Sequence, residues 1–294
     1  MNQCYNTKRI VELPDKTIPP KESEMTSEEF GFKKFTENPF YKGINVRLVD
    51  AADPVPGQHI VDLACGTGLV TQLSAAKLQD ARESLIIAFD HSSSALRQAK
   101  EDLATARASL VEFVQGQMED LAGTLKQSVD TIVFGNGIHY VPDKRSLIEQ
   151  VFNSLKPGGT FVFNTSFYEG WTRPESQAFA RRWMARALRE LREQHGLRPT
   201  RDKVESRNYL TAAQYCEMLE EQGFSIKQNE EISVDVPIGG WVDISEFEDF
   251  IVGAMPGIPL ATASPILQDT ARQTFSDMNL THVPRNWLQV VATK

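Results

Sequence analysis

Residues 60–71 read IVDLACGTGLVT, an apolar run that passes into a turn with two glycines. The apolar run predicts a buried strand, and the residues after Gly68 predict a helix. Gly66 and Gly68 carry no Cβ, so a ligand can approach the backbone of the turn closely. The free N–H groups and the positive dipole end of the helix favour an anion. The segment predicts a ligand site; a tight turn without a ligand is the alternative.

A carboxylate is expected beside this turn. The run from Leu85 to Phe89 predicts a strand that ends at Asp90. The carboxyl ends of neighbouring parallel strands meet at one edge of a sheet, and a carboxylate there can accept both ribose hydroxyls of an adenosine. Capping the next helix is the alternative role for Asp90. The hydroxyls of residues 92–94, all serine, are available for that cap.

The rest of the chain alternates short β-branched runs with amphipathic stretches, which is typical of a parallel sheet covered by helices. Strands are expected at 60–64, 85–90, 110–115, 131–135, 160–164, 224–232 and 287–293. The apolar spacing after Asp143 predicts a helix that stops before residues 156–159, KPGG. Thr211 and Gln214 form a capping-box pattern at the start of another helix, which Gly223 ends.

Four segments resemble those of one family in order and spacing, the class I S-adenosylmethionine-dependent methyltransferases. Residues 61–68, VDLACGTG, resemble motif I, and residues 155–160, LKPGGT, resemble the segment before the fifth strand. Residues 115–121, QGQMEDL, resemble the segment that contacts adenine, and residues 134–141, FGNGIHYV, resemble the segment that lines the reacting methyl group. The resemblance extends over residues 57–167 and implies S-adenosylmethionine as cofactor and a small-molecule methyl acceptor.

The resemblance implies an α/β fold, with a Rossmann-like seven-stranded, mostly parallel sheet, helices on both faces and helical cap insertions. Composition and apolar spacing divide the chain into seven segments. They are a polar, mobile tail (1–30), a helical arm (31–56), the cofactor-binding core (57–167), a helical cap insertion (168–210), a core helix and strand (211–232), a second cap insertion (233–286) and the final strand (287–294).

The cofactor site implied by the resemblance has ten residues: Asp62, Ala64, Gly66, Thr67, Gly68, Asp90, His91, Gln117, Met118 and Asn136. Two positions depart from the family pattern. Ala64 stands where many members have glycine, and Gln117 stands where many have an aspartate that accepts the adenine N6 hydrogens. A neutral amide, or Glu119 or Asp120, would then make the adenine contact. Neither departure changes the expected cofactor.

Methyl transfer from a sulfonium is an in-line displacement, so catalysis consists largely of holding the acceptor aligned with the methyl group. A general base helps when the acceptor is a hydroxyl or a carbon acid. His139 is the candidate base or substrate orienter, because it follows the fourth predicted strand and the unperturbed pKa of a histidine side chain is close to neutral. A histidine that only holds the loop in shape is the alternative. Tyr140 and Tyr168 are further candidates for the pocket wall.

The two insertions are expected to close over the cofactor. Between Phe179 and Leu197 one helix face is apolar, and the opposite face carries five arginines, at 181, 182, 186, 189 and 192. A solvated face is one interpretation; the other is that one or two of them, such as Arg186, bind a carboxylate or phosphate. In the second insertion, Trp241 precedes a capping-box pattern at Ser245 and Glu248 and a helix with an apolar side. The combined hypothesis is a partly lipophilic acceptor with one anionic group.

Composition and motifs narrow the alternatives. The net charge of -8 argues against general nucleic-acid affinity, and no apolar run approaches the roughly 20 residues of a membrane span. The three cysteines show no zinc-site spacing and no metal site is expected; without an apolar leader the expected location is the cytoplasm. A nicotinamide-dependent oxidoreductase would have Gly or Ala in place of Thr71, and an exocyclic-amine methyltransferase would have proline after Asn136. A protein methyltransferase and a non-catalytic scaffold remain as alternatives.

Overall fold

Five parallel strands form the half of the sheet that contains the glycine turn. The computed structural model describes residues 31–78, 83–103, 110–201, 204 and 208–294, so the predicted N-terminal tail lies outside the described residues. The strands are β1 (His59–Leu63), β2 (Leu85–Asp90), β3 (Val111–Gln115), β4 (Val129–Gly135) and β5 (Leu155–Thr165). Their registers are parallel throughout. The predicted positions of these strands are confirmed to within a few residues.

Two long strands complete the sheet. They are β6 (Ser225–Pro237) and β7 (His282–Thr293), and the strand order is β3-β2-β1-β4-β5-β7-β6. Strand β7 runs antiparallel to both of its neighbours. The predicted seven-stranded, mostly parallel Rossmann-like sheet is therefore confirmed.

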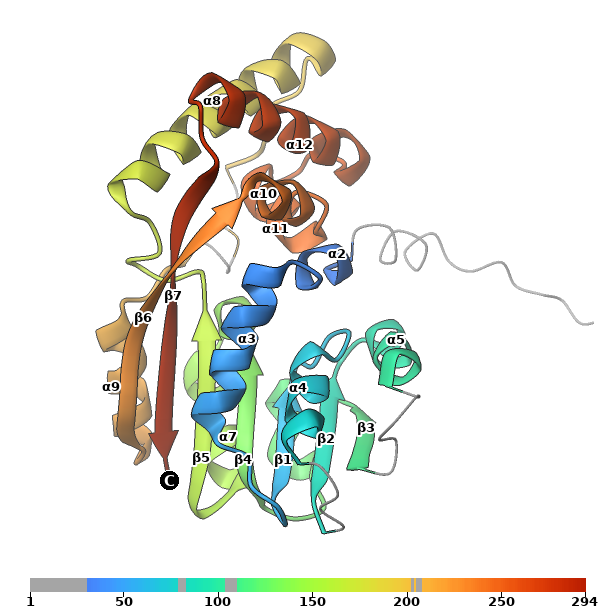
Figure 1. The fold of residues 1–294 in the computed structure, drawn as a ribbon, viewed down its shortest axis with the longest axis vertical. Helices are drawn as coiled ribbons and strands as arrows, with labels where there is room; N and C mark the ends of the chain where they lie inside the picture. Colours follow the sequence, from blue (N-terminus) through green and yellow to red (C-terminus); the bar gives the residue numbers. More distant parts are fainter. Residues whose placement is uncertain (1–30, 79–82, 104–109, 202–203, 205–207) are drawn as a thin grey trace, which may run out of the picture.

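Helices cover both faces of this sheet (Figure 1). On one face α3 (Pro39–Ala52), α4 (Leu69–Lys77) and α5 (Ser93–Leu103) pack through residues such as Leu48, Val70 and Leu96. On the other face lie α6 (Leu121–Thr124), α7 (Lys144–Ser154) and α9 (Ala212–Gln222). The side chain of Thr211 accepts the N–H of Gln214 and Gly223 follows α9 with φ of 109°, so the predicted cap and stop of this helix are confirmed.

A helical cap lies beyond the carboxyl ends of the parallel strands (Figure 1). It contains α8 (Pro174–His195), α10 (Ile238–Ile244), α11 (Glu248–Ala254) and α12 (Leu260–Asp277). Phe179 and Trp183 of α8 pack in one hydrophobic cluster with Leu267 and Phe275 of α12. The short helix α2 (Lys33–Thr36) contacts α10, so the N-terminal arm also touches the cap. None of the described helices is long and apolar enough to cross a membrane.

Two sequence expectations about the second insertion are wrong. Strands β6 and β7 remain paired as far as Pro237 and His282, so the helical part is residues 238–281 and not 233–286. Side chains at these ends of both strands alternate between buried and more exposed positions, as a strand requires, and Val236, Val283 and Arg285 are among the buried ones. This alternation extends the strands into the segment that was expected to be helical. The Ser245 side chain donates to the carbonyl of Trp241 at the end of α10, and α11 begins at Glu248 without a side-chain cap. The predicted capping box of Ser245 and Glu248 is absent.

Candidate functional site

The turn after β1 is built from left-handed backbone. The φ angles of Ala64, Gly66 and Gly68 are 54°, 54° and 86°. A Cβ on Gly68 would come within 3.0 Å of the Ala99 Cβ, so glycine at this position allows α4 and α5 to pack closely. Ala64 adopts a conformation that side chains disfavour, which explains why glycine suits this position better.

Asp90 holds this turn in place. Its Oδ2 accepts the backbone N–H of Gly66 at 2.8 Å, and its Oδ1 accepts the backbone N–H of Ser92 at 2.8 Å. The Ser92 hydroxyl accepts the N–H of Ala95, so a serine serves the first turn of α5 as expected. A carboxylate has about four acceptor positions, so Asp90 can also accept ligand hydroxyls.

A second carboxyl group, that of Asp62, lies buried below the turn. Its Oδ2 accepts the hydroxyl of Thr71 at 2.5 Å, and the side chain is 2% exposed. Burial raises the pKa of Asp62 to about 7, against the hydrogen bonds from Thr71; the charge of Asp90 raises it further. An added positive charge in this place would stabilise the ionised form of Asp62.

The segment after β4 is fixed by two asparagines. The backbone N–H of Asn136 donates to Oδ1 of Asn164 at 2.8 Å, and φ of Asn136 is 50°. Oδ1 of Asn136 accepts the backbone N–H of Ser166 at 2.9 Å and its hydroxyl at 3.1 Å. These bonds tie the end of β4 to the end of β5.

The His139 ring lies behind the Tyr140 ring. It is 2% exposed, and its centroid is 4.1 Å from that of Tyr140 and 4.4 Å from that of Phe167. Its Nδ1 is 3.0 Å from the Thr165 hydroxyl. Tyr140 lines the cavity described next and His139 does not. This placement suits a residue that supports the wall.

The turn, Asp90 and the end of β4 open into one cavity of about 640 Å³. Core residues form its base, and the N-terminal arm and the cap form its remaining walls. The arm contributes Phe32, Lys33, Thr36, Tyr41 and Asn45, and the cap contributes Phe247, Glu248 and Asp249. No sequence motif marks the arm as part of the site, although Tyr41 and Asn45 are one helical turn apart on a buried face with Ile44 and Leu48. Polar groups on an otherwise apolar helix face are the signal that points to a ligand at this place.

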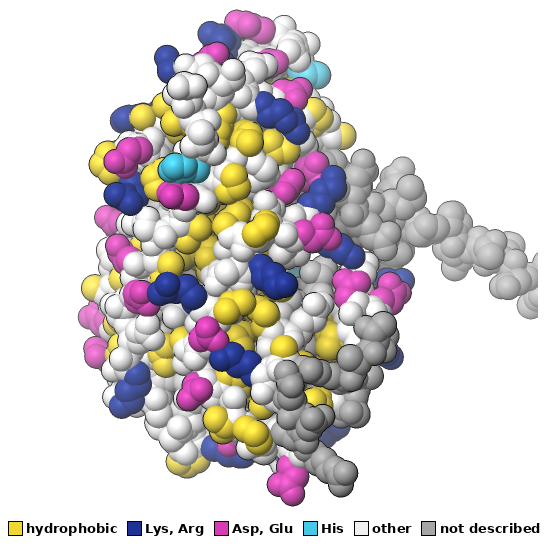
Figure 2. Space-filling model, viewed as in Figure 1, with side chains coloured by type: hydrophobic (Ala, Val, Ile, Leu, Met, Phe, Trp, Pro, Cys, Tyr) yellow, Lys and Arg dark blue, Asp and Glu magenta, His cyan; other side chains and the backbone are white. Residues whose placement is uncertain are grey.

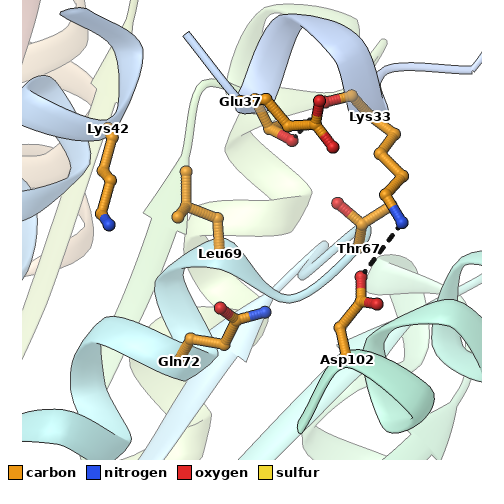
Figure 3. A pocket seen from close by; sticks show the side chains of 8 residues that line it. Lys33, Glu37, Lys42, Thr67, Leu69, Gln72 and Asp102 are labelled. Carbon is orange, nitrogen blue, oxygen red and sulfur yellow. Dashed lines mark hydrogen bonds and ion pairs between the residues drawn. The ribbon is translucent and has the colours of Figure 1, made fainter. Parts of the chain in front are cut away.

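A smaller hollow of about 420 Å³ adjoins this cavity (Figure 3). The two share Lys33, Thr36, Thr67 and Leu69. Lys33 lies 3.4 Å from Asp102 of α5, and Figure 3 shows this pair opposite Lys42. The hollow also contains Glu37, so its two lysines are matched by two carboxylates. It has no net charge to offer a ligand.

The structure brings together most of the predicted cofactor residues. Seven of them line the cavity: Asp62, Ala64, Gly66, Thr67, Asp90, His91 and Asn136. Gly68 shapes the turn. Gln117 and Met118 lie outside the cavity lining, at the start of a short 3-10 helix (Met118–Asp120) after β3. Their contact with adenine stays a prediction.

Three of the four proposed substrate residues lie outside the cavity, and only Tyr140 lines it. Tyr168 is fully buried in the core below the sheet face that packs on α9, and burial raises the pKa of its phenol. Trp241 is 3% exposed and packs edge-on against Phe179 inside the cap. Arg186 forms an ion pair with Asp277 of α12. Packing and ion pairing hold these three side chains outside the cavity lining, so their contact with the substrate stays a prediction.

Comparison with known proteins agrees with this geometry. A family model described as a methyltransferase domain matches residues 54–223, more than half of the chain. The chain belongs to this family, the class I methyltransferases that use S-adenosylmethionine.

Two curated relatives match part of the chain. The trans-aconitate 2-methyltransferase of Variovorax paradoxus is 33% identical over 110 residues, 37% of this chain and 39% of that protein. The demethylmenaquinone methyltransferase of Lactococcus lactis is 35% identical over 107 residues, 36% of this chain and 41% of that protein. The matched part of the chain thus spans about two fifths of each relative.

Solved structures share the fold at low identity. A putative methyltransferase from Bacillus halodurans has a TM-score of 0.55 and 16% identity, with 86% of this chain and 99% of that chain covered. The [4+2]-cyclase SpnF has a TM-score of 0.54 and 16% identity, with 88% and 85% covered. The second likeness shows that this fold also occurs in a protein named for a different reaction.

Proposed function

We propose that this protein transfers the methyl group of S-adenosylmethionine to a small-molecule acceptor bound between Tyr140 and the cap. The observation that carries the proposal is one continuous cavity. It joins the Gly66 turn and Asp90 to an aromatic wall that contains Tyr140 and Phe247. Its volume of about 640 Å³ is within the range of about 300–1,000 Å³ typical of small-molecule sites.

The residues on the core side fit this cofactor. Asp90 has acceptor positions left for the ribose hydroxyls, and the backbone of Gly66 and Thr67 faces the same cavity. Asp62 is a buried carboxyl group on the cavity wall whose raised pKa would fall beside a cation. Gln117 and Met118 are proposed to contact the adenine. When bound, the cofactor supplies an electrophilic methyl group.

The remaining work of the protein is alignment and shielding. Asn136 and Tyr140 form the wall next to the glycine turn, and the hydrogen bonds of Asn136 keep that wall fixed. Such a wall holds the acceptor in one orientation, which is the main requirement of an in-line displacement. His139 is proposed to support the Tyr140 ring from behind. The arm and cap exclude water from the reacting groups.

A small acceptor fits the relatives, which are named for trans-aconitate and demethylmenaquinone. Nucleic acid is disfavoured as an acceptor, because the chain carries a net charge of -8 and the visible face in Figure 2 shows both signs of charge interspersed. The cytoplasmic location expected from the sequence is part of this proposal.

Two measurements test the proposal. Calorimetry with S-adenosylmethionine and S-adenosylhomocysteine tests binding, and label transfer from methyl-labelled cofactor to a metabolite extract tests the reaction. Binding of both ligands together with a labelled product supports it. A folded protein that binds neither ligand would overturn it, and binding without transfer would favour a scaffold.

A further inference from the structure

The cap side of the cavity carries acidic residues and no matching cation. Glu248 and Asp249 at the start of α11 line the cavity, as do Asp62 and Asp90 of the core. Within the described part of the chain, the only lysine or arginine that lines it is Lys33, which is paired with Asp102. No ion pair joins Glu248 or Asp249 to another described residue. The cavity therefore has a negative wall.

Glu248 and Asp249 come from a different part of the chain than the cofactor residues. Asp62 and Asp90 are bonded to Thr71 and to the glycine turn, whereas Glu248 and Asp249 belong to the cap. The family model ends at residue 223, so α11 lies outside the segment that the family shares. Desolvation and the neighbouring Glu248 raise the pKa of Asp249, and His91 of the core, which lines the same cavity, lowers it. Asp249 therefore lies at the edge where cap and core meet.

A buried amide, that of Asn45, also lines this cavity. Asn45 is 1% exposed, and its Nδ2 donates to the carbonyl of Tyr41 at 2.9 Å. Oδ1 of Asn45 has no hydrogen-bond partner among the described residues and lies beside Gly135 at the end of β4. A buried oxygen without a partner costs stability until a donor reaches it. The cavity therefore offers buried and exposed oxygens to a ligand that carries N–H groups.

Four aromatic rings line the same cavity. The Phe32 and Phe247 centroids are 4.7 Å apart, and Phe32 is 5.5 Å from Tyr41. Tyr140 meets Phe247 edge-on at 6.4 Å. All four residues line the cavity. Aromatic faces attract organic cations and also pack against the apolar parts of such ligands.

We propose that the acceptor is a partly apolar amine, bound with its ammonium group against Glu248 and Asp249. This inference rests on the proposed function and replaces the hypothesis of an anionic acceptor, because Arg186 is paired with Asp277 outside the cavity. The ammonium group is a recognition element here.

Paired probes of opposite charge test this inference. Protein saturated with S-adenosylhomocysteine is titrated with 2-phenylethylamine, 2-phenylethanol and 3-phenylpropionate. We expect the amine to bind at least tenfold more tightly than the carboxylate. The variant Glu248→Gln with Asp249→Asn should lose that preference and keep its affinity for S-adenosylhomocysteine. Glu193→Gln, which removes an exposed carboxylate of α8, should keep the preference.

A second measurement needs no chosen probe. The labelled product formed from a metabolite extract should be retained by a cation exchanger at pH 7. Retention by an anion exchanger, or a carboxylate probe that binds as tightly as the amine, would overturn the inference while leaving the proposed function intact. If the wild-type protein does not bind S-adenosylhomocysteine, the result would instead count against the proposed function.

Discussion

The backbone N–H of Gly66, just after β1, donates to Oδ2 of Asp90, the last residue of β2, across 2.8 Å. One carboxylate therefore both shapes the glycine turn and lines the cavity beside it. Both the shape of the turn and the binding of the ribose should therefore depend on Asp90.

Replacement of Asp90 should weaken cofactor binding. Asp90→Ala removes a charged acceptor that hydroxyls of the ribose would use, so we expect a loss of about 1.5–3 kcal/mol in the free energy of binding. Calorimetry with S-adenosylhomocysteine measures it, and circular dichroism checks that the fold persists. Asp269→Asn on the exposed side of α12 is a suitable control. Unchanged affinity in a folded Asp90→Ala protein would refute the assignment.

The adenine contact can be tested by a ranking. If Gln117 faces the adenine edge, Gln117→Ala should reduce cofactor affinity more than Asp120→Ala does. Both side chains are exposed, so neither substitution should alter the fold. Equilibrium binding of the cofactor to the two variants gives the answer. The reverse ranking would place the adenine against the residues that follow Gln117.

Ala64 provides a stability prediction. Its φ of 54° lies in the left-handed region, which costs an alanine roughly 1–2 kcal/mol relative to glycine. Glycine loses more backbone entropy on folding, by roughly 0.5–1 kcal/mol. We therefore expect Ala64→Gly to raise the free energy of unfolding by up to about 1.5 kcal/mol, measured by urea denaturation. A lower stability for the variant would contradict the left-handed assignment.

Asp62 should make stability depend on pH. Its pKa in the folded protein is about 7, above the ordinary value of 3.8, so the folded state keeps a proton that the unfolded state has lost. Because the folded state then binds more protons, stability should fall as the pH rises from about 4 to about 7 and level off above that, by at most about 1.4 kcal/mol per pH unit. Asp62→Asn should lack this contribution. A wild-type minus variant difference that is constant between pH 4.5 and 8 would disprove it.

The core could be predicted from the sequence because its signals are local. Apolar runs, the glycine turn and the KPGG stop define their elements within a few residues, and five parallel strands follow from them. The sequence predicts β6 and β7 to be shorter than they are: β6 extends five residues beyond its expected end, and β7 begins five residues before its expected start. Polar residues alternate with buried ones there, and a short alternation next to helical segments is ambiguous without its partner strand.

The walls of the cavity could not be predicted from the sequence, because they are formed by contacts between segments that are far apart in the chain. Tyr41 and Asn45 come from the arm and Phe247 and Glu248 from the cap, and only the folded chain places these segments around the same space. Arg186 shows the reverse case. Its helix was predicted, but the ion pair with Asp277 depends on how α8 and α12 pack. Residue type and helical phase do not determine that arrangement.

The pairing of β6 with β7 continues to Pro237 and His282, the residues that flank helices α10 to α12. The two ends of this helical segment are therefore held next to each other by a strand ladder anchored in the sheet. Because its ends already meet, the segment 238–281 leaves and rejoins the sheet at a single point, much as a hairpin loop does. The three cavity residues that it contributes, Phe247, Glu248 and Asp249, are therefore held over the core by the strand ladder as well as by the packing of the helices.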